Sequence, residues 1–104
     1  MSNLNYNEIG QIIRVNVGED ISAATPTLFL LPEVGDKLEI TAGVSIPSVD
    51  VTVGEEVYLA NEYIEYATID EDLSYVGRWK KKAKLEYSSA NISQTDYVKF
   101  QVMP

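Results

Sequence analysis

The sequence of this 104-residue chain predicts an all-β fold. Seven short runs carry apolar and β-branched residues with a period of two, or as a brief continuous stretch, and both patterns are typical of strands. Clusters of Gly, Pro, Asn, Asp and Ser separate these runs, and such clusters form turns. No segment has the pattern of a capped amphipathic helix of ordinary length.

The first two strands are predicted at 11–17 and 27–31. In the run QIIRVNV, Ile13, Val15 and Val17 share one face with Gln11, because successive side chains of a strand point to opposite sides. The run TLFLL is apolar almost throughout, which indicates a strand that is buried on both faces. The remaining strands are expected at 37–41, 49–53, 62–69, 78–87 and 97–102.

Alternation also predicts which side chains of the later strands point inward. We expect the valines of VDVTV (49–53) to point into the core. In RWKKKAKLEY (78–87), Trp79, Ala83 and Leu85 share one side, together with Lys81 and Tyr87. The other side of this strand therefore carries cations.

About seven short strands in a chain of this length are typical of an immunoglobulin-like antiparallel β-sandwich. The chain contains no cysteine, which excludes the antibody subtype with its disulfide between the sheets. We expect one domain over residues 9–104. Residues 1–8 are polar, and we expect them to form an N-terminal extension that a neighbouring subunit holds.

Composition narrows the function classes. The net charge is −8 and there is no histidine, so the usual general base and the Ser-His and Cys-His nucleophile pairs are missing. We therefore expect no enzyme, no cofactor and no metal centre. An acidic chain is a poor match for nucleic acid, because phosphate contacts need cations. Without a long apolar run or a basic, apolar N-terminus, we also expect no membrane partner and no signal peptide.

The stretch DEDLSYVGRW (70–79) allows two interpretations. Asp70, Glu71 and Asp72 resemble part of a calcium loop, but the spaced ligands, the glycine and the final glutamate of such a loop are missing. The interpretation that we favour is a turn at one end of the sandwich. Gly77 then permits a positive φ, and Trp79 enters the next strand and fills the core.

Two groups of residues are candidates for an interface. Four cations, Arg78, Lys80, Lys82 and Lys84, form a stripe on one strand. The stripe is either a solvated face or a docking surface for an acidic neighbour such as another copy of the chain. Tyrosines of the segment YLANEYIEY are either interface anchors or cross-strand pairs on a half-exposed sheet. These tyrosines are Tyr58, Tyr63 and Tyr66.

Short motifs along the chain resemble those of immunoglobulin-like modules in tailed-bacteriophage virions, and most nearly the N-terminal domains of upper baseplate proteins. The first motif is D-I-S-A-A-T at 20–25, and P-E-V-G-D (32–36) is a looser match. The third is D-L-S-Y-V-G-R-W at 72–79, and Phe100 and Val102 match the final F-x-V. These motifs consist of turn and core residues, so they are mainly a signature of fold.

The resemblance implies a non-enzymatic structural protein of the virion. Such an accessory module would sit on the neck, tail, baseplate or capsid surface in symmetric copies and contact other virion structural proteins. The alternative is a carbohydrate- or cell-surface-binding module whose exposed tyrosines stack on sugars. The candidates for that role are Tyr58, Tyr63, Tyr66, Tyr75 and Tyr87.

Overall fold

Ten strands and no helix make up the part of the chain that the computed structural model describes, residues 3–5, 9–33, 35–69 and 77–103, and this confirms the all-β prediction. The strands are β1 (Asn3–Asn5), β2 (Ile12–Asn16), β3 (Thr25–Pro32), β4 (Leu38–Ile40), β5 (Val51–Val53), β6 (Glu56–Tyr58), β7 (Tyr63–Ala67), β8 (Gly77–Ser88), β9 (Asn91–Gln94) and β10 (Val98–Met103).

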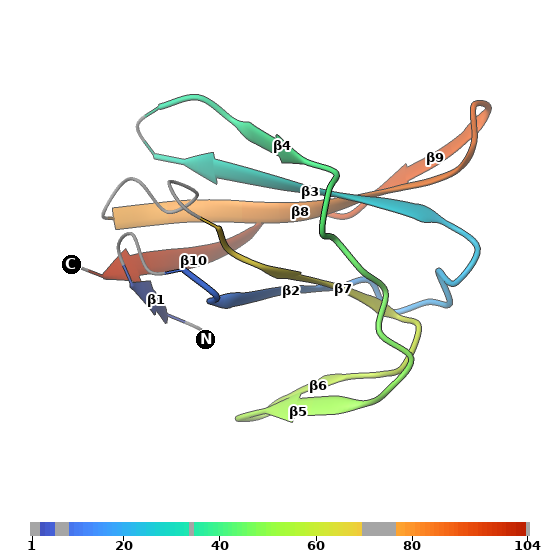
Figure 1. Cartoon of the computed structure of the whole chain (residues 1–104), viewed down its shortest axis with the longest axis horizontal. Coiled ribbons are helices and arrows are strands. Elements are labelled where there is room, and N and C mark those ends of the chain that lie inside the picture. The colour runs from blue at the N-terminus through green and yellow to red at the C-terminus, as the bar shows by residue number, and fades with distance from the viewer. Residues whose placement is uncertain (1–2, 6–8, 34, 70–76, 104) are drawn as a thin grey trace.

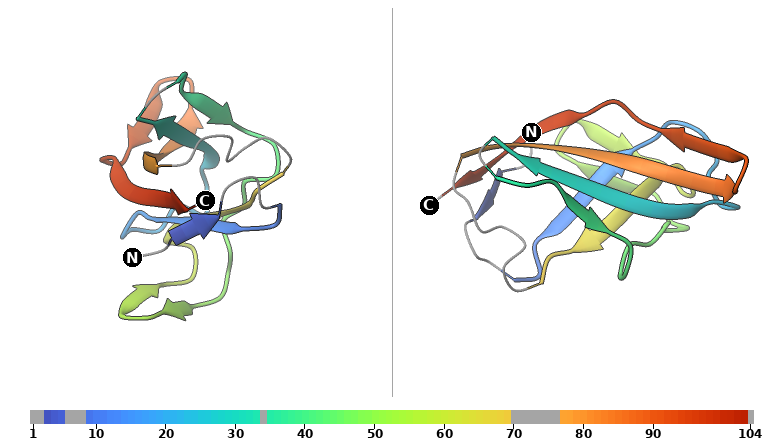
Figure 2. Two further views of the ribbon diagram at one scale, coloured as in Figure 1. Left: turned by 90° about the vertical axis from the view of Figure 1, so that its left-hand side faces the viewer. Right: turned by 90° about the horizontal axis from the view of Figure 1, so that it is seen from above.

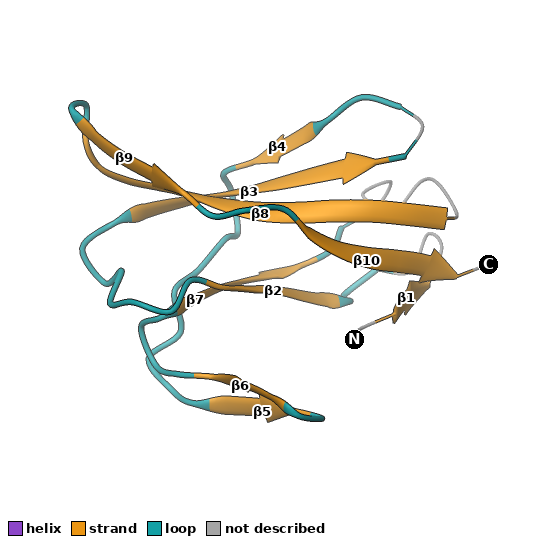
Figure 3. Ribbon diagram, turned by 180° about the vertical axis from the view of Figure 1, so that it is seen from behind, coloured by secondary structure: helices purple, strands orange, loops and turns teal. Residues whose placement is uncertain are grey.

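The larger sheet has the strand order β1-β10-β8-β3-β4, and β9 also pairs with β8. The 12-residue β8 is long enough to pair with β10 near its start and with β9 near its end, both along one edge (Figure 3). On its other edge, β8 pairs with β3 from Trp79 to Glu86. These pairs are antiparallel, whereas β1 runs parallel to β10.

A second layer lies across the core from this sheet. It is the antiparallel pair β2–β7, which an isolated bridge between Ser45 and Glu65 extends. In Figure 1 the pair runs below β3 and β8, and Figure 2 shows its strands crossing the larger sheet obliquely. The faces that the two layers turn toward each other supply the main apolar cluster.

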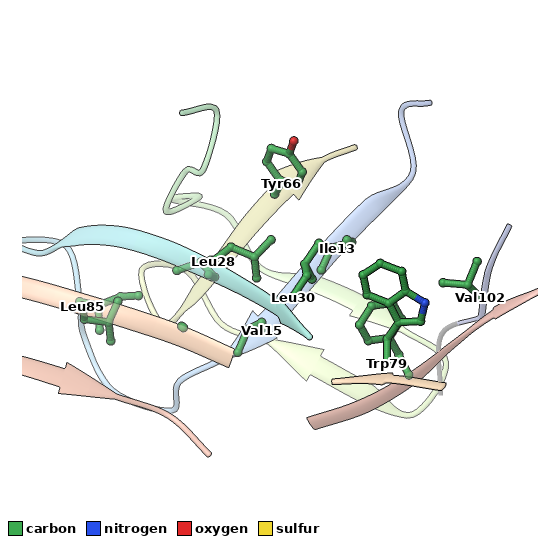
Figure 4. Packing of buried hydrophobic residues seen from close by; sticks show 12 residues of the cluster. Ile13, Val15, Leu28, Leu30, Tyr66, Trp79, Leu85 and Val102 are labelled. Carbon is green, nitrogen blue, oxygen red and sulfur yellow. The ribbon is translucent and has the colours of Figure 1, made fainter. Parts of the chain in front are cut away.

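Trp79 is the largest side chain of this core and is only 2% exposed. It lies near Leu30, Ile13 and Val102, so that both layers surround it (Figure 4). Its ring centroid is 6.0 Å from that of Phe100 on the neighbouring strand. Gly77 begins the strand with φ of +128°, a conformation that L side chains rarely adopt. Both expectations, a positive φ at Gly77 and a core position for Trp79, are confirmed.

All seven predicted strands are present, and each end lies within two residues of the prediction. Three further strands, β1, β6 and β9, lie in segments that the sequence pattern assigned to the extension or to turns. Each is three or four residues long and mostly polar, so no apolar period of two stands out from the neighbouring turn residues. Their pairing partners define them as strands.

The N-terminal extension is in part a strand of the domain itself. Asn3, Leu4 and Asn5 pair with Gln101, Val102 and Met103 of β10. The expectation that a neighbouring subunit holds this segment is therefore wrong for residues 3–5. The sequence did not reveal this strand, because three residues, two of them asparagine, are too few to show a periodic pattern.

The short hairpin of β5 and β6 lies outside the two layers, on the far side of β2–β7 from the larger sheet (Figures 1 and 2). The prediction that its valines point into the core is wrong for two of them, since Val49 is 61% and Val53 is 42% exposed. A two-stranded ribbon at the periphery can have the same alternating sequence as a core strand. No second layer covers Val49 and Val53 at its two ends, so they remain exposed.

We predict that deleting residues 1–5 will lower the free energy of unfolding by about 1 kcal/mol, because the deletion removes the strand that covers the edge of β10. For a domain of this size, such a loss lowers the melting temperature by roughly 4–8 °C. Thermal unfolding followed by circular dichroism measures the shift. An unchanged melting temperature would mean that β1 contributes nothing to the stability of the isolated chain.

Candidate interaction surface

The alternation of β8 separates four of its five cations from its core residues. Trp79, Ala83 and Leu85 are between 0% and 2% exposed and face β2–β7. Arg78 and Lys80 are exposed and Lys82 and Lys84 are partly exposed, all on the opposite face of the strand. The predicted stripe of cations is therefore present on the outer face of the larger sheet.

Tertiary structure adds two further cations to this stripe. Lys99 of β10 stands directly opposite Lys80, and the Nζ atom of Lys37, just before β4, lies 4.7 Å from the ring centroid of Phe29 on the outer face of β3. Six of the eight basic residues of the chain thus share one face. We call Lys37, Arg78, Lys80, Lys82, Lys84 and Lys99 the basic face.

The basic face has an apolar floor. Phe29 pairs with Lys82 and is only 6% exposed, because lysine side chains cover its ring. The Nζ atom of Lys82 lies 5.5 Å from the centroid of Phe29 and 4.7 Å from that of Tyr97. Such cation–π contacts hold the ammonium groups above the rings while the methylene stems cover apolar surface.

Few carboxylates offset this charge. Among the described residues, Glu39, which pairs with Phe29, and Glu86, which continues the outward row of β8, share the face, and Glu33 lies at one end of it. No ion pair between a basic-face cation and a described carboxylate lies within 4.0 Å; the ion pair found in the described part of the chain is Arg14–Glu65, on β2–β7. The cations of the basic face are therefore available to a partner.

One end of the basic face is hollowed. The hollow has a volume of about 680 Å³ and lies where β3 ends and β8 begins. A backbone hydrogen bond from the N–H of Glu33 to the carbonyl of Arg78, 2.9 Å long, closes this end of the strand pair. The lining residues are Leu31, Pro32, Glu33, Gly35, Arg78, Trp79, Lys80 and Lys99. Three cations against one carboxylate make the hollow suitable for an acidic group.

The three tyrosines proposed as interface anchors are buried. Tyr58, Tyr63 and Tyr66 are 3%, 0% and 4% exposed, so the expectation of exposed anchors is wrong. Tyr66 belongs to the main core (Figure 4). Tyr58 is the last residue of β6, and its ring packs on the inner side of the β5–β6 hairpin against Tyr63 of β7, with ring centroids 5.3 Å apart. Sequence alternation could not reveal this, because it does not show that a peripheral hairpin covers the outer face of β7.

Polar groups complete the contact beneath the hairpin. The hydroxyl of Tyr58 donates a hydrogen bond of 2.8 Å to Glu56, and that of Tyr63 donates one of 3.0 Å to the carbonyl of Val49. Arg14 pairs with Glu65 across β2–β7 at 2.9 Å, and its guanidinium carbon lies 5.9 Å from the ring centroid of Tyr58. Burial raises the pKa of both tyrosine hydroxyls, so they remain neutral donors.

Lys81 is the inward-facing lysine of β8 and is only 8% exposed. Its Nζ atom lies 5.7 Å from the ring centroid of Phe100. Burial lowers the pKa of this ammonium group; the negative charge of Glu56 opposes the shift and the positive charge of Arg14 adds to it. Lys81 is the one basic residue besides Arg14 that lies outside the basic face.

Within the described part of the chain, no three acidic side chains converge to form a metal site. The acidic residues Asp70, Glu71 and Asp72 lie outside the described residues, as does Tyr75. Tyr87 is another tyrosine proposed to stack on sugars, and its side chain is partly buried and packs against the core. In the described ranges there is no helix long and apolar enough to span a bilayer.

The described residues that resemble the phage motifs serve the fold. The carboxylate of Asp20 accepts a hydrogen bond of 2.9 Å from the backbone N–H of Ser22, and Ile21 is fully buried in the core. Phe100 and Val102 are core residues as well. Comparison of the chain with protein-family models, curated proteins and solved structures finds no match in any of the three.

We predict that Tyr63→Ala will lower the free energy of unfolding by about 3 kcal/mol, because it removes a fully buried ring. Tyr97→Ala is the control: this ring is 37% exposed, so its loss should change stability by less than about 1 kcal/mol. Urea titration measures both values. If Tyr63→Ala unfolds at the same urea concentration as the native chain, the ring does not stabilise the hairpin contact.

We predict that Lys81→Met will raise the free energy of unfolding at neutral pH by about 1 kcal/mol, since methionine avoids the desolvation of the ammonium group. Glu56 loses little, because it is exposed and also accepts the bond from Tyr58. The control is Lys84→Met, whose lysine points outward.

The gain should depend on pH. The pKa of Lys81 in the folded chain lies below the ordinary value of 10.5, so between these two values the unfolded state binds more protons and the native chain becomes more stable as pH rises. Below this window both states are protonated and the cost of burial is complete. The advantage of Lys81→Met should therefore shrink as pH approaches 10.5; urea titrations with an advantage that grows toward high pH would contradict this assignment.

Proposed function

We propose that the protein is a non-enzymatic structural module of a tailed-phage virion, which docks through its basic face on an acidic surface of a neighbouring virion protein. The observation that carries the docking role is the collection of six of the eight basic residues on one sheet face of an acidic chain. The motif resemblance carries the assignment to a virion, at the neck, tail, baseplate or capsid surface.

An immunoglobulin-like sandwich is the architecture that this proposal assigns to the module. The order β10-β8-β3-β4 supports it, because it corresponds to the G-F-C-C′ order of variable-type immunoglobulin sheets, and the pair β2–β7 then corresponds to B and E. Such sandwiches present a broad sheet face that is free to contact another protein. Here that face is the basic face.

Unpaired cations over an apolar floor favour docking over simple solvation. Leu31 and Tyr97 are partly exposed beside the cations, so a partner would bury apolar surface as well as neutralise charge. Complementary charge steers encounter and fixes orientation, whereas apolar contact supplies most of the affinity. The carbohydrate-binding alternative loses support, since three of its five tyrosines are buried.

The first test is immunogold electron microscopy, with antibody against this protein, on gradient-purified phage particles from the lysate. We expect gold at one discrete place on the particle. A protein that stays entirely in the soluble fraction would overturn the virion assignment. Gold particles scattered over the grid without association with phage particles would also overturn the virion assignment.

The second test compares two variants that each lower the net charge by two. Lys80→Gln with Lys82→Gln changes the basic face, and Ser89→Asp with Ala90→Asp changes the exposed turn between β8 and β9. We expect the first variant to be depleted from particles and the second to be retained, as quantitative mass spectrometry of gradient fractions measures. Equal retention would overturn the role of the basic face.

A further inference from the structure

The β5–β6 hairpin and its flanks, residues 49–62, form a second surface of opposite charge. This segment, VDVTVGEEVYLANE, contains four carboxylates and no basic residue. It also exposes apolar side chains: Val49, Val53, Val57 and Leu59 are 61%, 42%, 49% and 46% exposed. We call residues 49–62 the acidic hairpin. Exposed apolar groups that gather beside charges are typical of protein–protein contact sites.

The acidic hairpin and the basic face lie on opposite sides of the molecule. The hairpin lies beyond β2–β7, and the basic face is the outer face of the larger sheet; the views in Figures 1 and 2 agree on this arrangement. One molecule therefore cannot bring its own two surfaces together. Two molecules that are stacked in the same orientation can.

The acidic hairpin is held in a fixed position on its own domain. The side-chain amide of Asn16 of β2 donates a hydrogen bond of 3.0 Å to the carbonyl of Val57. Within the hairpin segment, Asp50 accepts one of 2.7 Å from the backbone N–H of Ala60. The buried Tyr58 and Tyr63 anchor the inner side. A preorganised surface loses less entropy on binding than a mobile loop does.

We propose that the acidic hairpin of one copy of this chain docks on the basic face of the next copy. The inference rests on the proposed function, in which the basic face is the docking surface, and it names the partner. Charge selects the pairing: two basic faces repel each other, as do two acidic hairpins, whereas one of each attracts. Each surface also supplies exposed apolar area, the valines and Leu59 on one side and Leu31 with Tyr97 on the other.

The acidic hairpin is a better occupant than the exposed acidic turn before Ile21. That turn, Gly18–Asp20, is followed by Ile21, which is fully buried in its own core, so the turn offers charge with little apolar surface. Charge alone contributes little at an exposed contact. The acidic hairpin offers both charge and exposed apolar surface.

The contact is heterologous, because different surfaces of the two copies meet. Each added copy leaves one basic face and one acidic hairpin free at the ends of the stack, so the association continues to a closed ring or to an open filament. A phage neck or tail is built from such repeated copies in the proposed function. A symmetric dimer would satisfy neither surface.

Two neutralising variants test the pairing. The face variant is Lys80→Gln with Lys82→Gln. The hairpin variant is Glu55→Gln with Val57→Thr, which keeps a β-branched residue in β6 and leaves Glu56, the partner of Tyr58, in place. Glu19→Gln with Ile9→Thr is a matched control outside both surfaces, since both residues are exposed.

Sedimentation velocity measures the mass of each sample at concentrations up to about 1 mM, an upper range for weak contacts. The native chain and the control should grow in mass with concentration, and raising the salt from about 50 mM to about 500 mM should reverse the growth. Each surface variant alone should stay monomeric. An equimolar mixture of the two should form a dimer and nothing larger, because only one intact hairpin and one intact face can meet.

A native chain that stays monomeric at about 1 mM and low salt would overturn this inference, as would a mixture of the two variants that forms no dimer. If the native chain stays monomeric but the face variant is depleted from particles, the partner of the basic face is another acidic virion protein, and the proposed function survives. Head-to-tail association by a protein that is absent from particles would leave this inference standing and overturn the proposed function.

Discussion

The two-sided pleat of β8 is the constraint on which the rest of the structure depends. This strand pairs along both edges, and it turns Trp79, Ala83 and Leu85 toward β2–β7 and four of its five cations away from them. A shift of register by one residue would exchange the two sets. The packing of Trp79 against both layers makes that shift costly, so the same burial that stabilises the core also keeps the cations together on the outer face.

A second, more polar contact holds the acidic hairpin to the domain. Tyr58 and Tyr63 bury their rings beneath it, and each hydroxyl finds an acceptor. In this contact the aromatic rings are buried and stabilise the fold, whereas valines and carboxylates of the hairpin remain exposed at the periphery. The molecule therefore carries opposite charges on opposite sides, even though its net charge is strongly negative.

Lys81 shows how the two contacts meet. It belongs to the inward row of β8, yet Glu56 of the hairpin and Arg14 of β2 act on its charge. The alternation in the sequence correctly placed Lys81 on the inward side, but it could not show which charges lie near it. Those charges come from strands that are distant along the chain, and only their packing brings them together.

The sequence alone determined the all-β class, seven of the described strands, the inward row around Trp79 and the outward stripe from Arg78 to Lys84, because a strand's period of two is a local property. Tertiary structure decided the remainder. It added Lys37 and Lys99 to the basic face through strand pairing, buried Tyr58 and Tyr63 beneath a hairpin, exposed the valines of that hairpin and joined residues 3–5 to β10. Each of these results depends on which strands become neighbours, and short-range patterning carries no information on that choice.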